Sequence, residues 1–223
     1  GLIQTVPRLT GGSTTYARLQ QFAASTYGEL LAVGLAAWHG PGGNYWGHNA
    51  IIRTRAFADA AGLPLLPGAP PLGGHILSHD FVEAALLRRA GWEVHLVPSL
   101  QGSFEGCPPT ITELVTRDRR WAQGNLQHLR LLGARGLPFL SRLHLAMGAT
   151  SYLASPLWAL TLIVGTILAV QAKYALPSYF GSEASLFPSW PVFDAKRALS
   201  LFVATVLVIH LPKILGAIWA LRD

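Results

Sequence analysis

The 223-residue sequence has few charged side chains, few lysines and a single cysteine. Charged residues make up 13% of the chain and hydrophobic residues 51%, which is too apolar for an ordinary soluble protein. Cys107 alone excludes an internal disulfide and fits a reducing compartment. The net charge of +6 rests on fourteen arginines and three lysines. This preference favours planar recognition of phosphate or carboxylate, and we expect no nucleic-acid partner.

One long stretch lacks charge altogether. No Asp, Glu, Lys or Arg occurs in the thirty positions between Arg142 and Lys173. The apolar run there exceeds the roughly 20 residues that span a bilayer, so we predict a transmembrane helix at about residues 149–172. A second run, at about 198–221, is long enough to span as well, with a kink near Pro212. The alternative is a buried helix hairpin of a soluble protein.

The arginines predict the orientation of these spans. Six arginines lie between residue 117 and the first span, against few acidic residues, and the connection between the spans is less basic. By the positive-inside rule, we predict a cytoplasmic domain at 1–136, an interfacial amphipathic helix at 137–148 and a transmembrane region at 149–223. Because the chain opens at Gly1 without an initiator methionine, we expect a fragment cut at both ends.

Strands and helices alternate in the cytoplasmic part. Hydrophobic spacings and turn residues predict strands at 1–7, 50–53 and 92–97, and helices at 16–38, 80–90 and from 111 to about 136. The sequence therefore predicts an α/β domain followed by transmembrane helices.

Asp80 stands at the start of the predicted helix 80–90. With Glu83 it forms the D-x-x-E pattern of a capping box, which explains an aspartate at this position without any function. The alternative is that its carboxylate accepts a proton from a substrate. The local pattern alone favours the cap.

A second motif lies in RDRRWAQGN, residues 117–125. Arg117 and Arg120 are three residues apart and share one helix face, and Trp121 follows them. Two guanidinium groups suit a pyrophosphate, and an indole suits the apolar face of a sugar ring. The alternative is an arginine-rich anchor beside a membrane helix.

Together these motifs resemble a known family. R-x-x-R-W before a membrane segment, preceded by an acidic residue that opens a helix, is similar to processive family 2 glycosyltransferases such as cellulose synthase. YWGHNAIIR, ILSHDFVEAALLRRAGWEV, GSFEGCPP, RDRRWAQGN and SYLASPLW, in this order, resemble the glucan biosynthesis glucosyltransferase H family of Gram-negative bacteria. The resemblance covers nearly the whole chain.

The resemblance implies a multi-pass enzyme of the bacterial inner membrane, with its catalytic part in the cytoplasm. Such an enzyme transfers glucose from UDP-glucose to a growing periplasmic glucan and couples synthesis to export. Its fold would be the C-terminal half of a GT-A type glycosyltransferase domain, followed by an interfacial helix and two transmembrane helices in contact with membrane lipid.

The resemblance also assigns roles to residues. Asp80 would be the general base, and Arg117 and Arg120 would hold the donor pyrophosphate. The expected acceptor-binding residues are Trp121, Tyr45, Trp46 and Gly47, with His48 and His79 as further residues of the pocket. For Tyr45 and Trp46 the alternative is a loop pinned to the core by its aromatic side chains.

Two parts of the family pattern are missing. The family's metal-binding D-x-D motif does not occur in this sequence. We therefore expect that the parent enzyme binds Mg²⁺ with residues outside this chain, that this chain holds no metal ligand, and that the isolated chain has little activity. Gly106 follows Glu105 where a second glutamate is expected, which weakens a paired-carboxylate role there. The rival interpretations are a non-catalytic membrane-anchored scaffold, or another processive synthase that makes cellulose, chitin or hyaluronan.

Overall fold

The computed structural model describes residues 1–174 and 195–220. The chain divides into two compact units. The first comprises Gly1–Leu153 with the C-terminal residues from Gly216, and the second comprises Ala154–Leu215. The predicted connection between the two spans lies mostly in residues 175–194, outside the described residues.

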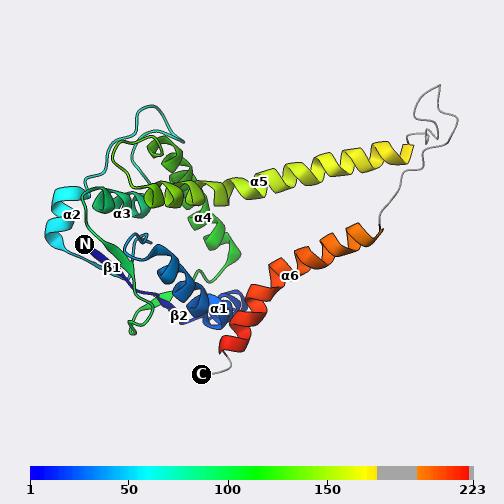
Figure 1. Ribbon diagram of the computed structural model, residues 1–223, viewed down its shortest axis with the longest axis horizontal. Helices are drawn as coiled ribbons and strands as arrows, with labels where there is room; N and C mark the ends of the chain where they lie inside the picture. Colours follow the sequence, from blue (N-terminus) through cyan, green and yellow to red (C-terminus); the bar gives the residue numbers. More distant parts are fainter. Residues whose placement is uncertain (175–194, 221–223) are drawn as a thin grey trace. The chain divides into compact units, whose positions relative to one another are not determined.

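Two small sheets lie in the first unit (Figure 1). β1 (Leu2–Gln4) is the centre of one sheet and pairs antiparallel with β3 (Ala50–Ile52) and parallel with β4 (Val94–Leu96). β2 (Arg8–Thr10) pairs parallel with β5 (Phe104–Gly106) in the other. Since side chains alternate along a strand, the first and third residues of β1 are buried while the middle one is exposed.

The helices match the hydrophobic spacing of the sequence. Their bounds are α1 Thr15–His39, α2 Thr54–Ala60, α3 His79–Arg89, α4 Ile111–Gln127, the 3₁₀ helix η1 His128–Leu131, α5 Phe139–Tyr174 and α6 Ala195–Ala220. α1 and α4 begin with threonine caps, since Thr14 accepts from the Ala17 N–H at 3.1 Å and Thr110 from the Glu113 N–H at 3.3 Å. Such caps satisfy backbone donors that the first turn leaves unpaired.

α3 is the buried centre of the first unit. All six residues from 82 to 87 are buried. On one side Leu86 belongs to a hydrophobic cluster with Leu145 of α5, and on the other Leu87 belongs to a cluster with Val94 of β4. Each buried leucine contributes about 1.5–3 kcal/mol of hydrophobic stabilisation. A helix packed on two sides is held firmly, and so are the residues that open it.

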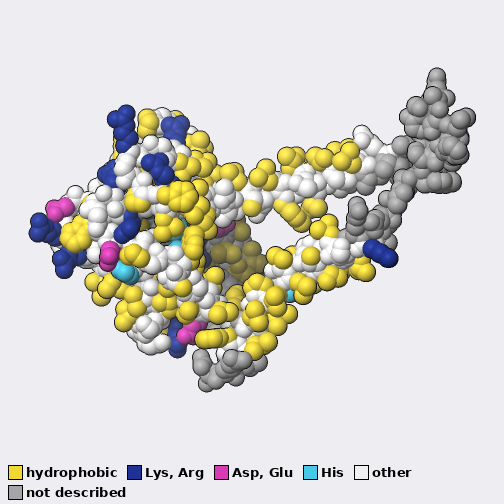
Figure 2. All heavy atoms as spheres, viewed as in Figure 1, with side chains coloured by type: hydrophobic (Ala, Val, Ile, Leu, Met, Phe, Trp, Pro, Cys, Tyr) yellow, Lys and Arg dark blue, Asp and Glu magenta, His cyan; other side chains and the backbone are white. Residues whose placement is uncertain are grey.

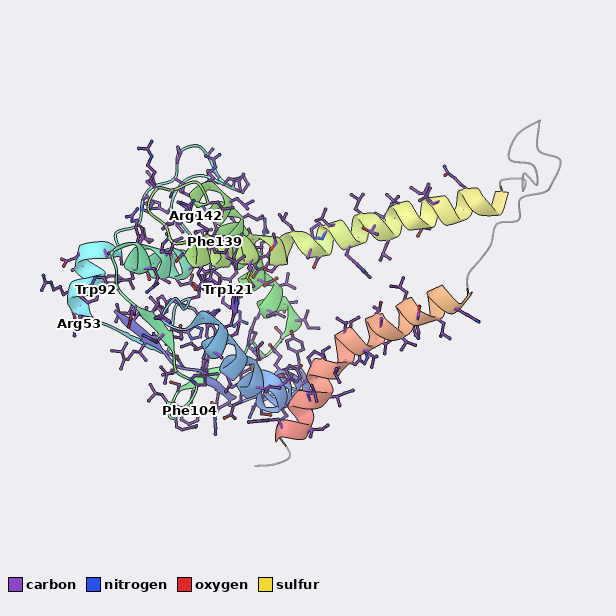
Figure 3. All side chains as sticks on the ribbon, viewed as in Figure 1. Arg53, Trp92, Phe104, Trp121, Phe139 and Arg142 are labelled. Atoms are coloured by element: carbon purple, nitrogen blue, oxygen red, sulfur yellow. The ribbon has the colours of Figure 1, made fainter. Side chains whose placement is uncertain are left out.

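The start of α5 is anchored to the turn before it by Arg142, labelled in Figure 3. Its guanidinium donates to the backbone carbonyls of Leu132, of Ala134 at 2.7 Å and of Leu137 at 3.2 Å. Arg142, the last charged residue before the predicted span, therefore also binds three carbonyls of the turn that precedes α5.

The structure has one helix where the sequence predicts two. α5 begins at Phe139, two residues into the predicted interfacial segment 137–148, and continues without a break through the predicted span 149–172. Ser141, His144 and Leu145 are buried within the first unit. This part of α5 packs on the domain because Leu145 joins the core cluster on α3.

Among the described residues, one helix is long and apolar enough to cross a bilayer. It covers Phe139–Leu168, 30 residues, with a hydropathy of 1.6, and none of its apolar 18-residue window is buried in the protein. Hydrophobic side chains cover α5 beyond the first unit, whereas Lys and Arg gather on the first unit (Figure 2). The apolar part of α6, Leu199–Leu215, is shorter. The structure thus indicates membrane association, and it does not confirm two spans.

Candidate active site

The first turn of α3 carries Asp80, but not as the predicted capping box. Ser78 is the N-cap residue, and its side chain makes no capping hydrogen bond. Glu83 does not reach back to the cap, since its carboxylate lies 3.0 Å from Nδ1 of His79 and is buried. Asp80 is one residue inside the helix. The capping interpretation of the D-x-x-E pattern is therefore wrong.

Asp80 lies against the loop that carries the aromatic residues. Gly47 has a φ of +88°, and a Cβ placed there would come within 3.3 Å of Oδ2 of Asp80. Only glycine adopts this backbone conformation without strain. The carboxylate therefore faces a bare stretch of backbone, and a side chain at position 47 would crowd it.

Burial raises the pKa of Asp80 above its ordinary value. The backbone N–H groups of Asp80 and Phe81, together with His79 and His128, oppose this increase in pKa. Burial and then the charges of Glu83 and Asp80 raise the pKa of Tyr45, so its phenol keeps its proton at neutral pH. A carboxylate with a raised pKa next to a neutral phenol is a site suited to accepting a proton.

The loop from Tyr45 to Asn49 is held by Gln4, a fully buried side chain of β1. Its Oε1 accepts from the Trp46 N–H at 2.8 Å, and its Nε2 donates to the His48 carbonyl at 2.7 Å. The side chain thus binds the backbone on both sides of Gly47. This contact fixes the glycine in front of Asp80.

The end of α4 holds the residues that lead into α3. Gln127, almost fully buried, accepts from the Leu77 N–H at 3.0 Å and donates to the His75 carbonyl at 3.0 Å. Nε2 of the fully buried His128 lies 2.8 Å from the Ser78 carbonyl and donates to it. We call Gln127 and His128 the α4 clamp. It joins the helix of the R-x-x-R-W motif to the turn that carries Asp80.

Ser78 also contacts α4 directly. Its hydroxyl lies 3.5 Å from the Trp121 carbonyl and 3.4 Å from Nδ2 of Asn125. The structure therefore brings the backbone of Trp121 next to the residue two positions before Asp80. Ser78 and Trp121 are 43 residues apart in the sequence, and the proximity of their motifs was expected from the resemblance.

Arg117 and Arg120 face one hollow on α4. The hollow has a volume of about 470 Å³ and is lined by these two arginines with Thr112, Glu113 and Thr116. The Arg117 guanidinium also lies 4.5 Å from the ring centroid of Trp121, which Figure 3 labels on α4. Its Nε is buried without a hydrogen-bond partner among the described residues. Two arginines at one hollow, one with a spare donor, can bind an anionic group.

The two histidines of the predicted pocket are paired with carboxylates. His48 lies 3.5 Å from Glu105 and His79 lies 3.0 Å from Glu83. Glu105 therefore contacts the loop beside Gly47 without a second glutamate. His48 and His79 have half-exposed side chains, and a role of either in substrate binding stays a prediction.

A metal site does not form from the described residues. Within 1–174 and 195–220, no group of three or more His, Cys, Asp or Glu side chains gathers where it could hold an ion. The Mg²⁺ expected for the parent enzyme therefore has no set of ligands in the part of the chain that the structure describes.

Sequence reasoning missed Gln4, Gln127 and His128. A glutamine in the apolar run LIQ is one available signal, because a polar side chain on the buried face of a strand must find partners. Gln127 and His128 offered a weaker signal, since polar residues near a helix end are common. Only the packing of α3 on α4 shows what they bind.

Comparison with known proteins supports the motif resemblance. A family model, Glycosyl transferase family group 2, matches residues 9–215. Glucans biosynthesis glucosyltransferase H of Vibrio cholerae serotype O1 is 58% identical over 223 residues, and that of Shewanella oneidensis is 57% identical. Each alignment covers 100% of this chain and 31% of the relative, so the chain spans about a third of the length of these curated relatives. The resemblance to glucosyltransferase H is thereby confirmed, and the chain belongs to glycosyl transferase family group 2.

Proposed function

We propose that this chain carries the acceptor-activating and leaving-group side of an inverting glucosyltransferase that builds a glucan from UDP-glucose. The observation that carries the proposal is the position of Asp80, which faces Gly47 on one side and is joined through Ser78 to α4 at Trp121 on the other. The name of the relatives, glucans biosynthesis glucosyltransferase H, supports glucan as the product.

In the proposed reaction, Asp80 accepts the proton of an acceptor hydroxyl while that oxygen attacks the anomeric carbon of glucose. The new carbon–oxygen bond forms as the bond from that carbon to the diphosphate breaks, so configuration inverts and UDP leaves. The raised pKa of Asp80 makes its carboxylate a stronger base than a solvent-exposed aspartate.

The leaving group is proposed to lie at the hollow of Arg117 and Arg120. Negative charge builds on the diphosphate as the bond to glucose breaks, and two guanidinium groups stabilise it more in the transition state than in the ground state. Arg117 covers one face of the Trp121 ring, and the other face is proposed to stack on the acceptor sugar together with Tyr45 and Trp46. No step is assigned to Mg²⁺, because the described residues supply no set of ligands for it.

The membrane location is part of the proposal. The exposed apolar helix of α5 supports insertion in the bacterial inner membrane, with residues 1–136 in the cytoplasm. We include α6 as a second span, which would give the growing glucan a route out through the membrane. Coupling of synthesis to export rests on this arrangement and on the relatives.

The test is Asp80→Asn in the full-length gene product, with Asp59→Asn as the matched control. Asp59 is an exposed aspartate of α2 that pairs only with Arg55 among the described residues. Glucose incorporation from labelled UDP-glucose should fall by at least about 100-fold in Asp80→Asn and stay unchanged in the control. UDP binding, measured by calorimetry, should be kept in both.

Glucan synthesis at the normal rate by Asp80→Asn would disprove the base assignment. Product analysis with other labelled UDP-sugars tests the donor, since incorporation of N-acetylglucosamine or glucuronic acid instead of glucose would favour a chitin or hyaluronan synthase. Absence of any transfer by the unmodified protein would favour a scaffold.

A further inference from the structure

The α4 clamp contains a histidine that no motif accounts for. His128 is fully buried at the junction of α4 and η1, and its ring stacks on Phe81 of α3 with a centroid distance of 5.6 Å and an interplanar angle of 20°. It lies outside the R-x-x-R-W motif and touches the helix of Asp80 at two points, the Ser78 carbonyl and the Phe81 ring.

The protonation of His128 follows from its surroundings. Burial lowers its pKa, while the Ser78 carbonyl and the negative charge of Asp80 act in the opposite direction. The neutral imidazole carries one N–H, and Nε2 must hold it because a carbonyl can only accept. Nδ1 is buried without a hydrogen-bond partner among the described residues. The single proton of this ring is therefore committed to Ser78.

The hydrogen bond from His128 holds Ser78, and the position of Ser78 affects the distances from the Asp80 carboxylate to Gly47 and to Trp121. Ser78 is the N-cap of α3, two residues before Asp80, and its hydroxyl contacts the Trp121 carbonyl. A shift of Ser78 along α4 would move the Asp80 carboxylate relative to both Gly47 and Trp121. Hydrophobic packing holds α3 in the core but is non-directional, whereas this hydrogen bond fixes one atom, the Ser78 carbonyl oxygen, in distance and angle.

We propose that His128 is a positioning residue for the proposed transfer reaction, whose Nε2–H fixes the Ser78 carbonyl and thereby the Asp80 carboxylate beside Trp121. The inference rests on the proposed function, in which Asp80 accepts a proton from an acceptor hydroxyl and must be aligned with it. A positioned base contributes to rate only when its carboxylate lies within hydrogen-bond reach of the acceptor hydroxyl.

Two substitutions separate the N–H from the ring. His128→Phe keeps an aromatic ring on Phe81 and removes the donor, whereas His128→Gln removes the ring and can place an N–H near the position of Nε2. Since the Ser78 carbonyl also faces the helical N–H groups of α3, loss of the His128 donor leaves it with a partner. His95→Phe is the control, a histidine of β4 whose side chain is 41% exposed and pairs with Glu93.

The full-length gene product is assayed for glucose transfer at saturating acceptor. His128→Phe should lower kcat by roughly 10- to 100-fold with the KM for UDP-glucose unchanged, and His128→Gln should recover most of the lost kcat. His95→Phe should behave as the unmodified protein. A thermal shift measurement on each variant accompanies the kinetics.

A purely structural role of the ring predicts the reverse order, with His128→Phe active and His128→Gln impaired. That order, or equal losses in both variants with or without a lower Tm, overturns the proposal. Asp80→Asn distinguishes failure of the positioning role of His128 from failure of the proposed function. If Asp80→Asn is inactive while His128→Phe keeps its kcat, only the positioning role fails, and if Asp80→Asn is active, the proposed function itself fails.

Discussion

Gly124→Ala tests whether α3 and α4 must meet as closely as the structure shows. Gly124 lies on α4, and a Cβ built there would come 2.8 Å from the Ser78 Cβ and closer still to the Ser78 backbone nitrogen and hydroxyl. Ordinary van der Waals contact begins near 3.4 Å, so the two segments must separate by at least about 0.6 Å. The backbone nitrogen cannot rotate away as a side chain could.

Two effects of opposite sign decide the stability of this variant. Alanine in place of glycine inside a helix stabilises by about 1 kcal/mol. Overpacking in a closely packed interior costs about 1–3 kcal/mol. We therefore expect Gly124→Ala to lose between about 0 and 2 kcal/mol in free energy of unfolding. Displacement of Ser78 also moves Asp80, and a misplacement approaching 1 Å lowers kcat by about 100-fold.

The matched control is Gly34→Ala on α1. A Cβ at Gly34 meets nothing within 4 Å, so only the helix term applies and Tm should rise. Glucose transfer and Tm are measured for both variants in the full-length gene product. An unchanged kcat in Gly124→Ala together with a raised Tm would refute the close approach of α3 and α4. A loss of activity in Gly34→Ala would show that the assay reports something other than this contact.

Two further predictions concern Asp80 and Gln4. Because the folded-state pKa of Asp80 is raised, the folded protein binds this proton more tightly than the unfolded chain, and stability falls as pH rises through that range. Asp80→Asn should therefore keep or raise Tm at pH 7, and a clear drop would contradict the burial argument. In the unmodified protein, kcat should fall on acidification with a midpoint above 3.8, the ordinary pKa of aspartate, and a flat profile down to pH 4 would exclude the carboxylate as base. Gln4→Leu should leave the Trp46 N–H and the His48 carbonyl unpaired and lower the free energy of unfolding by about 1–3 kcal/mol. It should also raise the KM for acceptor more than the KM for UDP-glucose. An unchanged KM for acceptor would show that the loop does not need this contact.

The longer elements were predictable from the sequence because their hydrophobic spacing is strong. α3 was expected at 80–90 and is found at His79–Arg89, and α1 was expected at 16–38 and is found at Thr15–His39. β2 and β5 were not predicted, since their side chains are mostly exposed and no alternation of hydrophobic residues marks them in the sequence. Pairing of such short strands depends on long-range contacts that no local pattern records.

The limits of local patterns are clearest at the ends of α3 and α4. The D-x-x-E spacing predicted a capping box, yet Glu83 is turned inward on His79 because its position faces the buried side of α3. The helix of R-x-x-R-W was expected to continue to about residue 136, but α4 ends at Gln127 and tightens into η1. At this end the side chains of Gln127 and His128 bind the chain before α3.

Buried polar side chains, rather than apolar packing, set the geometry around Asp80. Gln4 binds the loop in front of the carboxylate, and Gln127 and His128 bind the turn behind it. Burying these groups brings little net stability, because each hydrogen bond only replaces one made to water. These hydrogen bonds specify position, since an amide or imidazole bonded to one backbone atom loses that bond if the two segments shift relative to each other. An apolar substitute of similar volume would leave these backbone groups unpaired, at a cost of about 1–3 kcal/mol, and would leave the position of Asp80 free to vary. A loss of rate larger than this loss of stability accounts for is therefore the expected mark of this arrangement.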